Sequence, residues 1–178
     1  MKNSTLLFLI SFVFCFAQCK KNKPDSNGLP PATQEGKNTL GFLLNGQVWK
    51  PQGNNGTANL SVDVDFGFKN GIFDIAAYRR LTSNSRDQIT FGIPDSLNFF
   101  QIPKTMVLGP NTLAGLSFTN EICDYFSRDL ITFSSGRMTI SKLDKVNRIF
   151  AGTFDAILYK INCGDTIKIT EGRFDMKY

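Results

Sequence analysis

The sequence of 178 residues contains no histidine. Histidine is the usual general base near neutral pH and the commonest metal ligand, so its absence argues against many hydrolases and zinc enzymes. The chain also lacks a G-x-S-x-G turn and a glycine-rich phosphate loop. Asp74 and Asp155 are isolated and do not form the paired carboxylates of a glycosidase. We therefore expect a non-catalytic protein that needs no cofactor.

Long hydrophobic runs are scarce as well. The segment Leu6–Phe16 is apolar except for Ser11, and it is too short to span a bilayer, which takes about 20 residues. A basic start followed by a short apolar segment is typical of a secretory signal peptide. This segment leads directly to Cys19 and then to a polar stretch, 20–23. The arrangement resembles a bacterial lipoprotein signal, in which the cysteine is acylated and the chain is cut just before it.

Residues 1–18 are thus predicted to be a lipoprotein signal peptide, and Cys19 is predicted to be the lipid attachment site. Two or three acyl chains on Cys19 would attach the protein stably to a membrane. Cys15 is interpreted as part of the apolar segment, because Val13-Phe14 before it is a poor cleavage context. Simple secretion with Cys19 as an ordinary thiol, and an uncleaved membrane helix, are the alternatives.

Only two of the four cysteines, Cys123 and Cys163, remain outside the N-terminal segment. An exported chain enters an oxidising compartment, where paired cysteines form disulfides. We therefore predict a Cys123–Cys163 disulfide. Reactive free thiols are the alternative, although no histidine is present to activate them.

The formal net charge of +5 is concentrated outside the predicted fold. Residues 19–38 are rich in proline, glycine, asparagine, serine and charge, which predicts a flexible tether. From Asn38 onward there are 15 basic and 13 acidic residues, so the rest of the chain is nearly neutral. We therefore expect the basic residues of the N-terminal segment to lie next to a membrane surface, and we expect no nucleic-acid partner.

Short alternating segments predict an all-β domain over residues 39–178. From Asn59 to Lys69 apolar and polar residues alternate, as in a half-buried strand. Residues 94–110 contain three prolines and are interpreted as an irregular crossover with a short strand near 105–108. Successive hairpins at this spacing predict an antiparallel β-sandwich, with an open or closed β-barrel as the alternative.

Turn residues separate the predicted strands. Asn45-Gly46 and Asn70-Gly71 favour two-residue hairpin turns, because asparagine and glycine accept positive φ angles. The sequence Ser134-Ser135-Gly136 is interpreted as a further hairpin turn. In the last strand the apolar phase changes at Glu171-Gly172, which predicts a β-bulge.

The alternating segment carries two aspartates that could act as metal ligands. Asp63 and Asp65 share one face of the predicted strand, as calcium ligands sometimes do, but calcium needs six or more oxygen atoms. A solvated strand face accounts for both residues without a metal. We therefore predict no metal site.

The C-terminal half resembles a known family. Its ordered series runs from Cys123-Asp124-Tyr125 through GRMTISKLD (136–144) and RIFAGTF (148–154) to CGDTIKITEGRFDMKY (163–178), and LLNGQVWKP (43–51) precedes it. Together these segments resemble the DUF6252-type lipoproteins of Bacteroidetes, whose pattern ends in "ITKLD…RIISGTF…ITEGRFD". The resemblance implies an exported, β-rich lipoprotein and implies no activity.

These observations predict a lipid-anchored protein of the bacterial cell envelope. Its domain would be a non-catalytic binding or interaction module; the alternative is a β-barrel carrier of a small apolar ligand. An enzyme that uses carboxylates is a third hypothesis. Some Bacteroidetes lipoproteins use an acidic run after the lipidated cysteine for surface export, and no such run follows Cys19. We therefore expect an outer-membrane, periplasm-facing position.

Overall fold

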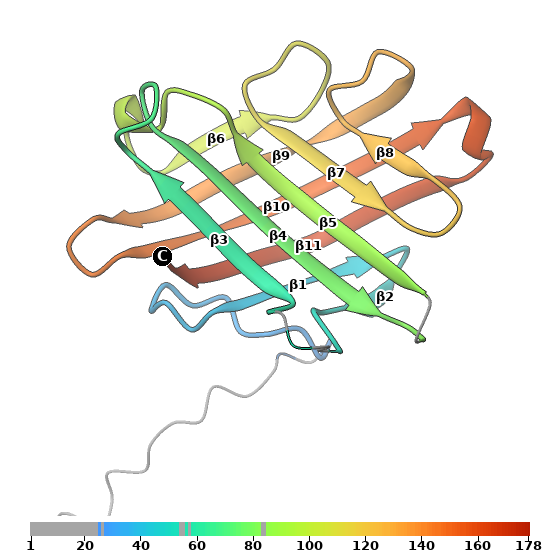
Figure 1. The fold of residues 1–178 in the computed structure, drawn as a ribbon, viewed down its shortest axis with the longest axis horizontal. Coiled ribbons are helices and arrows are strands. Elements are labelled where there is room, and N and C mark those ends of the chain that lie inside the picture. Colours follow the sequence, from blue (N-terminus) through green and yellow to red (C-terminus); the bar gives the residue numbers. More distant parts are fainter. Residues whose placement is uncertain (1–24, 26, 54–55, 57, 83–84) are drawn as a thin grey trace, which may run out of the picture.

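The structure is a computed structural model that describes residues 25, 27–53, 56, 58–82 and 85–178 (Figure 1). Two antiparallel sheets pack face to face, with strand orders β2-β1-β11-β10-β9-β6 (sheet A) and β3-β4-β5-β7-β8 (sheet B). The strands are β1 Thr39–Leu44, β2 Gln47–Trp49, β3 Leu60–Asp65, β4 Ile72–Arg80, β5 Arg86–Ile93, β6 Lys104–Val107, β7 Gly115–Thr119, β8 Asp124–Phe126, β9 Thr132–Asp144, β10 Ile149–Lys160 and β11 Thr166–Lys177.

Each sheet has two open edges among the described strands, so the sheets do not close into a barrel. The predicted antiparallel β-sandwich is therefore confirmed, and the barrel alternative is wrong. The crossover between β5 and β7 contains a short 3-10 helix, η2 Leu97–Phe99, and the predicted short strand β6. A second 3-10 helix, η3 Ile161–Cys163, connects β10 to β11.

Phenylalanine side chains fill the space between the two sheets. The rings of Phe73 and Phe150 lie 4.6 Å apart between centroids, and those of Phe91 and Phe154 lie 4.7 Å apart. Phe174 contacts three of these rings. Because buried aromatic rings each remove a large apolar area from water, this cluster is a major source of the apolar burial that stabilises the sandwich.

Two local predictions are confirmed. Asn45 and Gly46 have φ angles of 49° and 83°, as a type I′ hairpin turn requires. The bulge predicted at Glu171-Gly172 is present, since the pairing of β10 with β11 changes register between Phe154 and Ala156. Glu171 itself has a positive φ angle of 53°.

One predicted turn is wrong, and one predicted hairpin has a longer connection. Ser134-Ser135-Gly136 lies inside the continuous strand β9, where a Cβ atom on Gly136 would lie 2.2 Å from the carbonyl oxygen of Asp155. This glycine therefore permits a close approach of neighbouring strands rather than a turn. The hairpin predicted at Asn70-Gly71 is present, because β3 and β4 pair antiparallel, but its connection is longer and spans residues 66–71.

The disulfide between Cys123 and Cys163 is confirmed, with their Cα atoms 5.9 Å apart. Cys123 directly precedes β8 in sheet B, and Cys163 ends η3 after β10 in sheet A. The bond therefore links the two sheets at one end of the sandwich.

The N-terminal segment differs from its prediction. Residues 19–38 are predicted to be a flexible tether, but residues 27–38 pack on the outer face of sheet A, and Leu29 is fully buried there. This part of the predicted tether is corrected by the structure. We call Asp25 together with residues 27–38 the strap. The folded part of the chain therefore begins before residue 39, the predicted start of the domain.

Candidate binding groove

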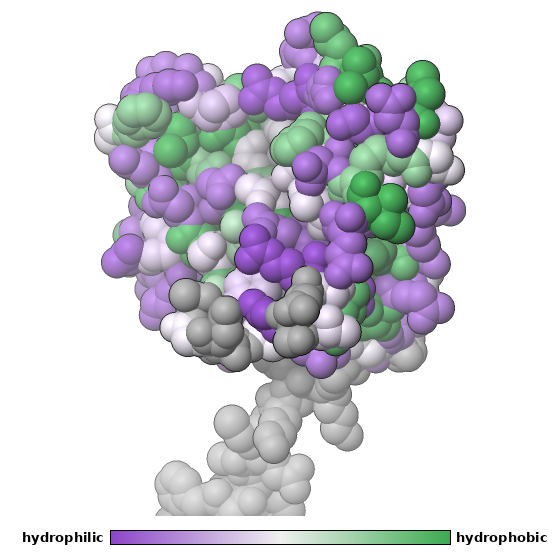
Figure 2. Space-filling model, turned by 45° about the vertical axis from the view of Figure 1, so that its right-hand side comes forward, coloured by the Kyte–Doolittle hydropathy of each residue, from purple (hydrophilic) through white to green (hydrophobic). Residues whose placement is uncertain are grey.

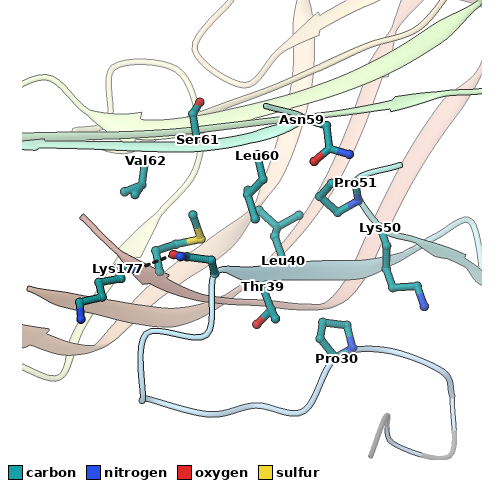
Figure 3. Close-up of a pocket in the computed structure, with 12 residues that line it drawn as sticks. Pro30, Thr39, Leu40, Lys50, Pro51, Asn59, Leu60, Ser61, Val62 and Lys177 are labelled. Atoms are coloured by element: carbon teal, nitrogen blue, oxygen red, sulfur yellow. Dashed lines mark hydrogen bonds between the residues drawn. The ribbon is translucent and has the colours of Figure 1, made fainter. Parts of the chain in front are cut away.

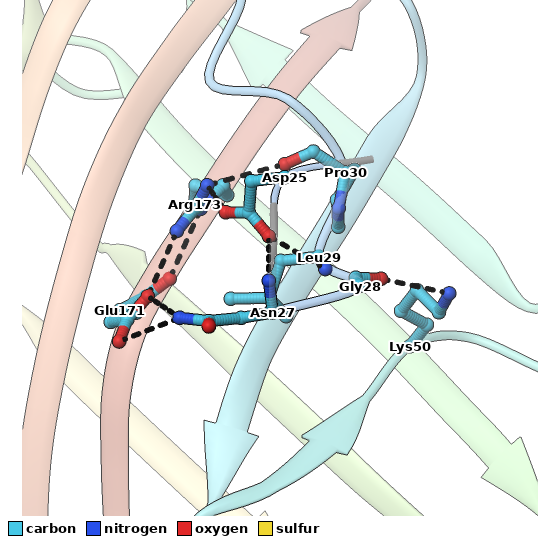
Figure 4. A network of polar contacts seen from close by, with 8 residues as sticks. All are labelled: Asp25, Asn27, Gly28, Leu29, Pro30, Lys50, Glu171 and Arg173. Carbon is cyan, nitrogen blue, oxygen red and sulfur yellow. Dashed lines mark hydrogen bonds and ion pairs between the residues drawn. The ribbon is translucent and has the colours of Figure 1, made fainter. Parts of the chain in front are cut away.

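The strap is held by the three charged residues of the motif ITEGRFD in β11, of which Glu171 and Arg173 are drawn in Figure 4. Arg173 donates a hydrogen bond from Nη1 to Oδ2 of Asp25 at 2.5 Å, and it also donates to the carbonyl oxygen of Pro30. Burial alone would raise the pKa of Asp25, but the backbone N–H of Leu29 and the guanidinium of Arg173 outweigh it and lower that pKa below its ordinary value. The first turn of the strap is therefore fixed to sheet A by charge.

Asp175 holds the following part of the strap. Its side chain is 1% exposed, and its carboxylate accepts hydrogen bonds from the hydroxyl of Thr33 and from the backbone N–H groups of Glu35, Gly36 and Lys37. A buried charge is tolerated when several donors surround it. This carboxylate therefore orders the strap up to the start of β1.

Gly41 in β1 allows the strap to approach closely. A Cβ atom on Gly41 would lie 2.6 Å from Cδ of Pro30 and 3.4 Å from a methyl group of Leu29. Only glycine lacks this atom, so residue 41 leaves the space that Pro30 occupies on sheet A.

An open groove with a volume of about 630 Å³ lies next to the strap (Figure 3). One wall is the start of β3, and the other is formed by the start of β1 and the end of β11. The side chains of Leu60 and Val62 point from sheet B towards Leu40 of sheet A in Figure 3. Lys50 and Lys177 lie at the rim, and Nζ of Lys50 donates to the carbonyl oxygen of Gly28 in the strap. The groove therefore lies between the two sheets at an open edge of the sandwich.

The backbone of β3 forms part of this edge. The N–H of Tyr78 donates to the carbonyl oxygen of Asn59 at 3.0 Å, so the hydrogen-bonded pairs with β4 fall at residues 59, 61, 63 and 65. The backbone groups of Leu60, Val62 and Val64 consequently point away from β4. In the described part of the chain no strand pairs with this side of β3.

Three acidic side chains lie on the outer face beside this edge. Asp63 of β3 pairs directly with Asp74 of β4, and Asp65 accepts the N–H groups of Gly67 and Phe68. Desolvation and then the charge of Asp63 raise the pKa of Asp74. Among the described residues neither Asp63 nor Asp74 has a basic partner.

The sequence-predicted site residues lie apart from the groove. Cys19 is outside the described residues. The disulfide lies next to the beginning of β11, whereas the groove lies at its end. The described residues contain no group of three or more histidine, cysteine, aspartate or glutamate side chains arranged to hold a metal ion.

A second hollow, of about 790 Å³, lies near the other end of the molecule. Leu130, Ile131, Phe133 and Ile161 line it, and each of these side chains is at least 60% exposed. Figure 2 shows several groups of hydrophobic side chains among hydrophilic ones, including some at the top of the view. Nothing in the described structure indicates what would cover them.

Comparisons with known proteins add no assignment: no family model, no curated protein and no solved structure matches this chain. Within the residues that the structure describes, no helix is long and apolar enough to cross a membrane.

Sequence reasoning missed both the strap and the groove. Arg173 and Asp175 of β11 each bind the strap. The available signal was that both are charged residues on alternate positions of a strand with otherwise apolar neighbours. For the groove, the signal was the alternation of Val62 and Val64 with Asp63 and Asp65, but alternation does not say whether a strand lies at an edge.

Proposed function

We propose that this chain is a lipid-anchored protein of the bacterial cell envelope whose β-sandwich is a non-catalytic binding module. The observation that carries the binding role is the open groove between β3, β1 and β11, in a sandwich whose interior is otherwise filled by aromatic and aliphatic side chains. Concave sites of about 300–1,000 Å³ are the usual form of binding sites, and the lining of this groove is divided between apolar and polar residues.

The anchor in this proposal is Cys19, as the apolar segment before it suggests. Six residue steps separate Cys19 from Asp25, the first described residue of the strap. Such a connection reaches at most about 20 Å when fully extended. We therefore infer that the strap-bearing side of the sandwich stays close to the membrane.

The alternative function, a carrier of a small apolar molecule, has less support. It required a barrel with a central cavity, and the fold is an open sandwich. The phenylalanines that would have lined such a cavity contact one another in the core, as do Phe150 and Phe174 at 5.4 Å.

Acylation of Cys19 is tested by feeding labelled palmitate to cells that express the chain. We expect the label on the wild-type protein and on Cys15→Ala, and its loss from Cys19→Ala. The Cys15→Ala variant is the matched control because it removes a thiol from the same segment. Continued labelling of Cys19→Ala would contradict the anchor.

The envelope position is also part of the proposal, as is membership of the DUF6252-type lipoproteins. We propose that the protein is attached to the outer membrane and faces the periplasm. Protease added to intact cells should leave the domain uncut, whereas permeabilised cells should lose it. Digestion in intact cells would place the domain on the cell surface instead.

A further inference from the structure

The groove has the properties of a site for one more β-strand. We propose that β3 binds an extended segment of a partner protein, with apolar residues at alternate positions and lysine or arginine between them. This inference rests on the proposed binding role of the groove and specifies the chemistry of its partner.

The backbone of β3 supplies the first argument. Its six residues make it the longest of the strands at the sheet edges, since β2 and β8 have three residues each and β6 has four. The outward N–H and C=O groups of Leu60, Val62 and Val64 match the hydrogen-bonding pattern that an added strand requires. Addition of a strand to an exposed edge is a common way to bind extended peptides.

The inner side chains supply the second argument. Leu60, Val62 and Val64 are only partly buried, although they point towards the core. Every second side chain of an added strand would enter the groove and cover Leu60 and Val62 against Leu40 and Met176. Burial of this apolar surface favours apolar residues at those positions.

The charges on the outer face of β3 and β4 determine which residues are favoured at the outward positions of an added strand. Like charges placed directly opposite each other destabilise a sheet, and Asp63 faces Asp74 without a basic neighbour in the described part of the chain. A lysine or arginine on an added strand opposite Asp63 would share its face and lie about 5 Å away. It would neutralise this repulsion, so the outward positions should be basic.

The same charges disfavour a second copy of this chain as the occupant. If two β3 strands paired about a twofold axis, Asp63 and Asp65 of both copies would be placed on one face of the joined sheet, and registers centred on residue 63 or 64 would bring them directly opposite one another. A partner with alternating basic residues avoids this repulsion.

The test measures the binding of two fluorescein-labelled peptides, VKVKVKV and VEVEVEV, to the full chain in detergent by fluorescence anisotropy. We expect the lysine peptide to bind at least tenfold more tightly than the glutamate peptide. Two further versions of the lysine peptide carry methyl groups on the backbone nitrogens of one edge or of the other. Methylation of the edge that faces β3 should reduce the affinity at least tenfold, and methylation of the opposite edge should have little effect. Equal binding of the two peptides would overturn the proposal.

Two variants of the protein locate the site. Val62→Pro removes an outward N–H and leaves the hydrogen bonds to β4 in place, because residues 61 and 63 make those bonds; it should weaken binding of the lysine peptide at least tenfold. Asp63→Lys should reverse the peptide preference, while Asp165→Lys, the same charge change in an exposed turn before β11, should not. Unchanged binding in both β3 variants would overturn the proposal.

Light scattering and truncation distinguish the other occupants. A wild-type dimer that becomes a monomer in Val62→Pro would assign the edge to a second copy and contradict a partner segment. Binding of the peptide only after removal of residues 1–18 would assign it to the chain's own beginning. Failure of peptide binding with intact palmitate labelling would overturn this inference and leave the anchor of Cys19 standing.

Discussion

At the scale of single residues, Asp175 is the main point at which the N-terminal strap depends on one side chain. Its carboxylate accepts four hydrogen bonds from residues 33–37. Asp175→Asn replaces one acceptor oxygen by a donor that faces N–H groups. Because hydrogen bonds to a charged group contribute about 1.5–3 kcal/mol, we expect a loss of about 2–3 kcal/mol in the free energy of unfolding, measured with denaturant.

The same variant should make the strap accessible to protease before the sandwich unfolds. Asp155→Asn is the control, since Asp155 forms an exposed ion pair with Arg137, and such pairs contribute less than about 1 kcal/mol. Equal stability of Asp175→Asn and Asp155→Asn would show that the strap does not depend on Asp175.

We predict that the side chain of Asp74 destabilises the folded protein at neutral pH. Desolvation and the charge of Asp63 raise the pKa of Asp74 above the ordinary value of 3.8. The folded protein therefore favours the protonated carboxyl. This contribution to stability is present below the unfolded-state pKa and is lost as the pH rises through the folded-state pKa. Asp74→Asn should therefore unfold at a higher temperature than wild type at pH 7, and the difference should disappear near pH 3.

Calorimetry of both proteins at several pH values measures this difference. Asp124→Asn at an exposed strand position is a suitable control, because it removes one carboxylate without the opposing Asp63. A wild-type protein that is more stable than Asp74→Asn at pH 7 would mean that Asp74 has a stabilising partner in solution.

At the scale of elements, the disulfide joins two connections that belong to different sheets. It closes a loop with a sequence separation of 40 residues, for which the chain-entropy model gives about 4 kcal/mol. We expect Cys163→Ser to lower the free energy of unfolding by about 2–4 kcal/mol and to remove the mobility difference between reduced and non-reduced samples. A variant with wild-type stability would show that packing alone holds this end together.

The strands could largely be predicted from sequence, because one face of each sheet is buried and the side-chain period of two is visible in the residues. The turn at Asn45-Gly46 followed from residue type. Gly136 could not be assigned in the same way, since a glycine that permits close strand packing looks identical in sequence to one that makes a turn.

The strap could not be predicted because its composition is that of a disordered segment. It buries little apolar surface of its own apart from Leu29 and Pro30, and its order comes from Arg173 and Asp175, which lie far away in the sequence. The composition of a segment indicates how much apolar surface that segment can bury by itself. It does not indicate that another strand, here β11, supplies hydrogen-bonding partners for the segment.

At the scale of the whole molecule, the groove borders the strap near the end of β11, and the apolar hollow around Leu130 lies where β9 begins and β10 ends, near the other end of the sandwich. If Cys19 carries the anchor, the edge of β3 faces the region next to the membrane. A partner that supplies a strand there would have to be an envelope protein with an extended segment close to the bilayer.

Residue-resolved amide hydrogen exchange of the full chain, with and without the peptide VKVKVKV, tests the binding role most directly. Because only the N–H groups of Leu60, Val62 and Val64 point away from β4, we predict that the peptide slows exchange at these three residues. Ser61, Asp63 and Asp65 are already paired with β4 and should change little. Unchanged exchange throughout β3, or protection confined to the hollow around Leu130, would contradict a binding site at this edge.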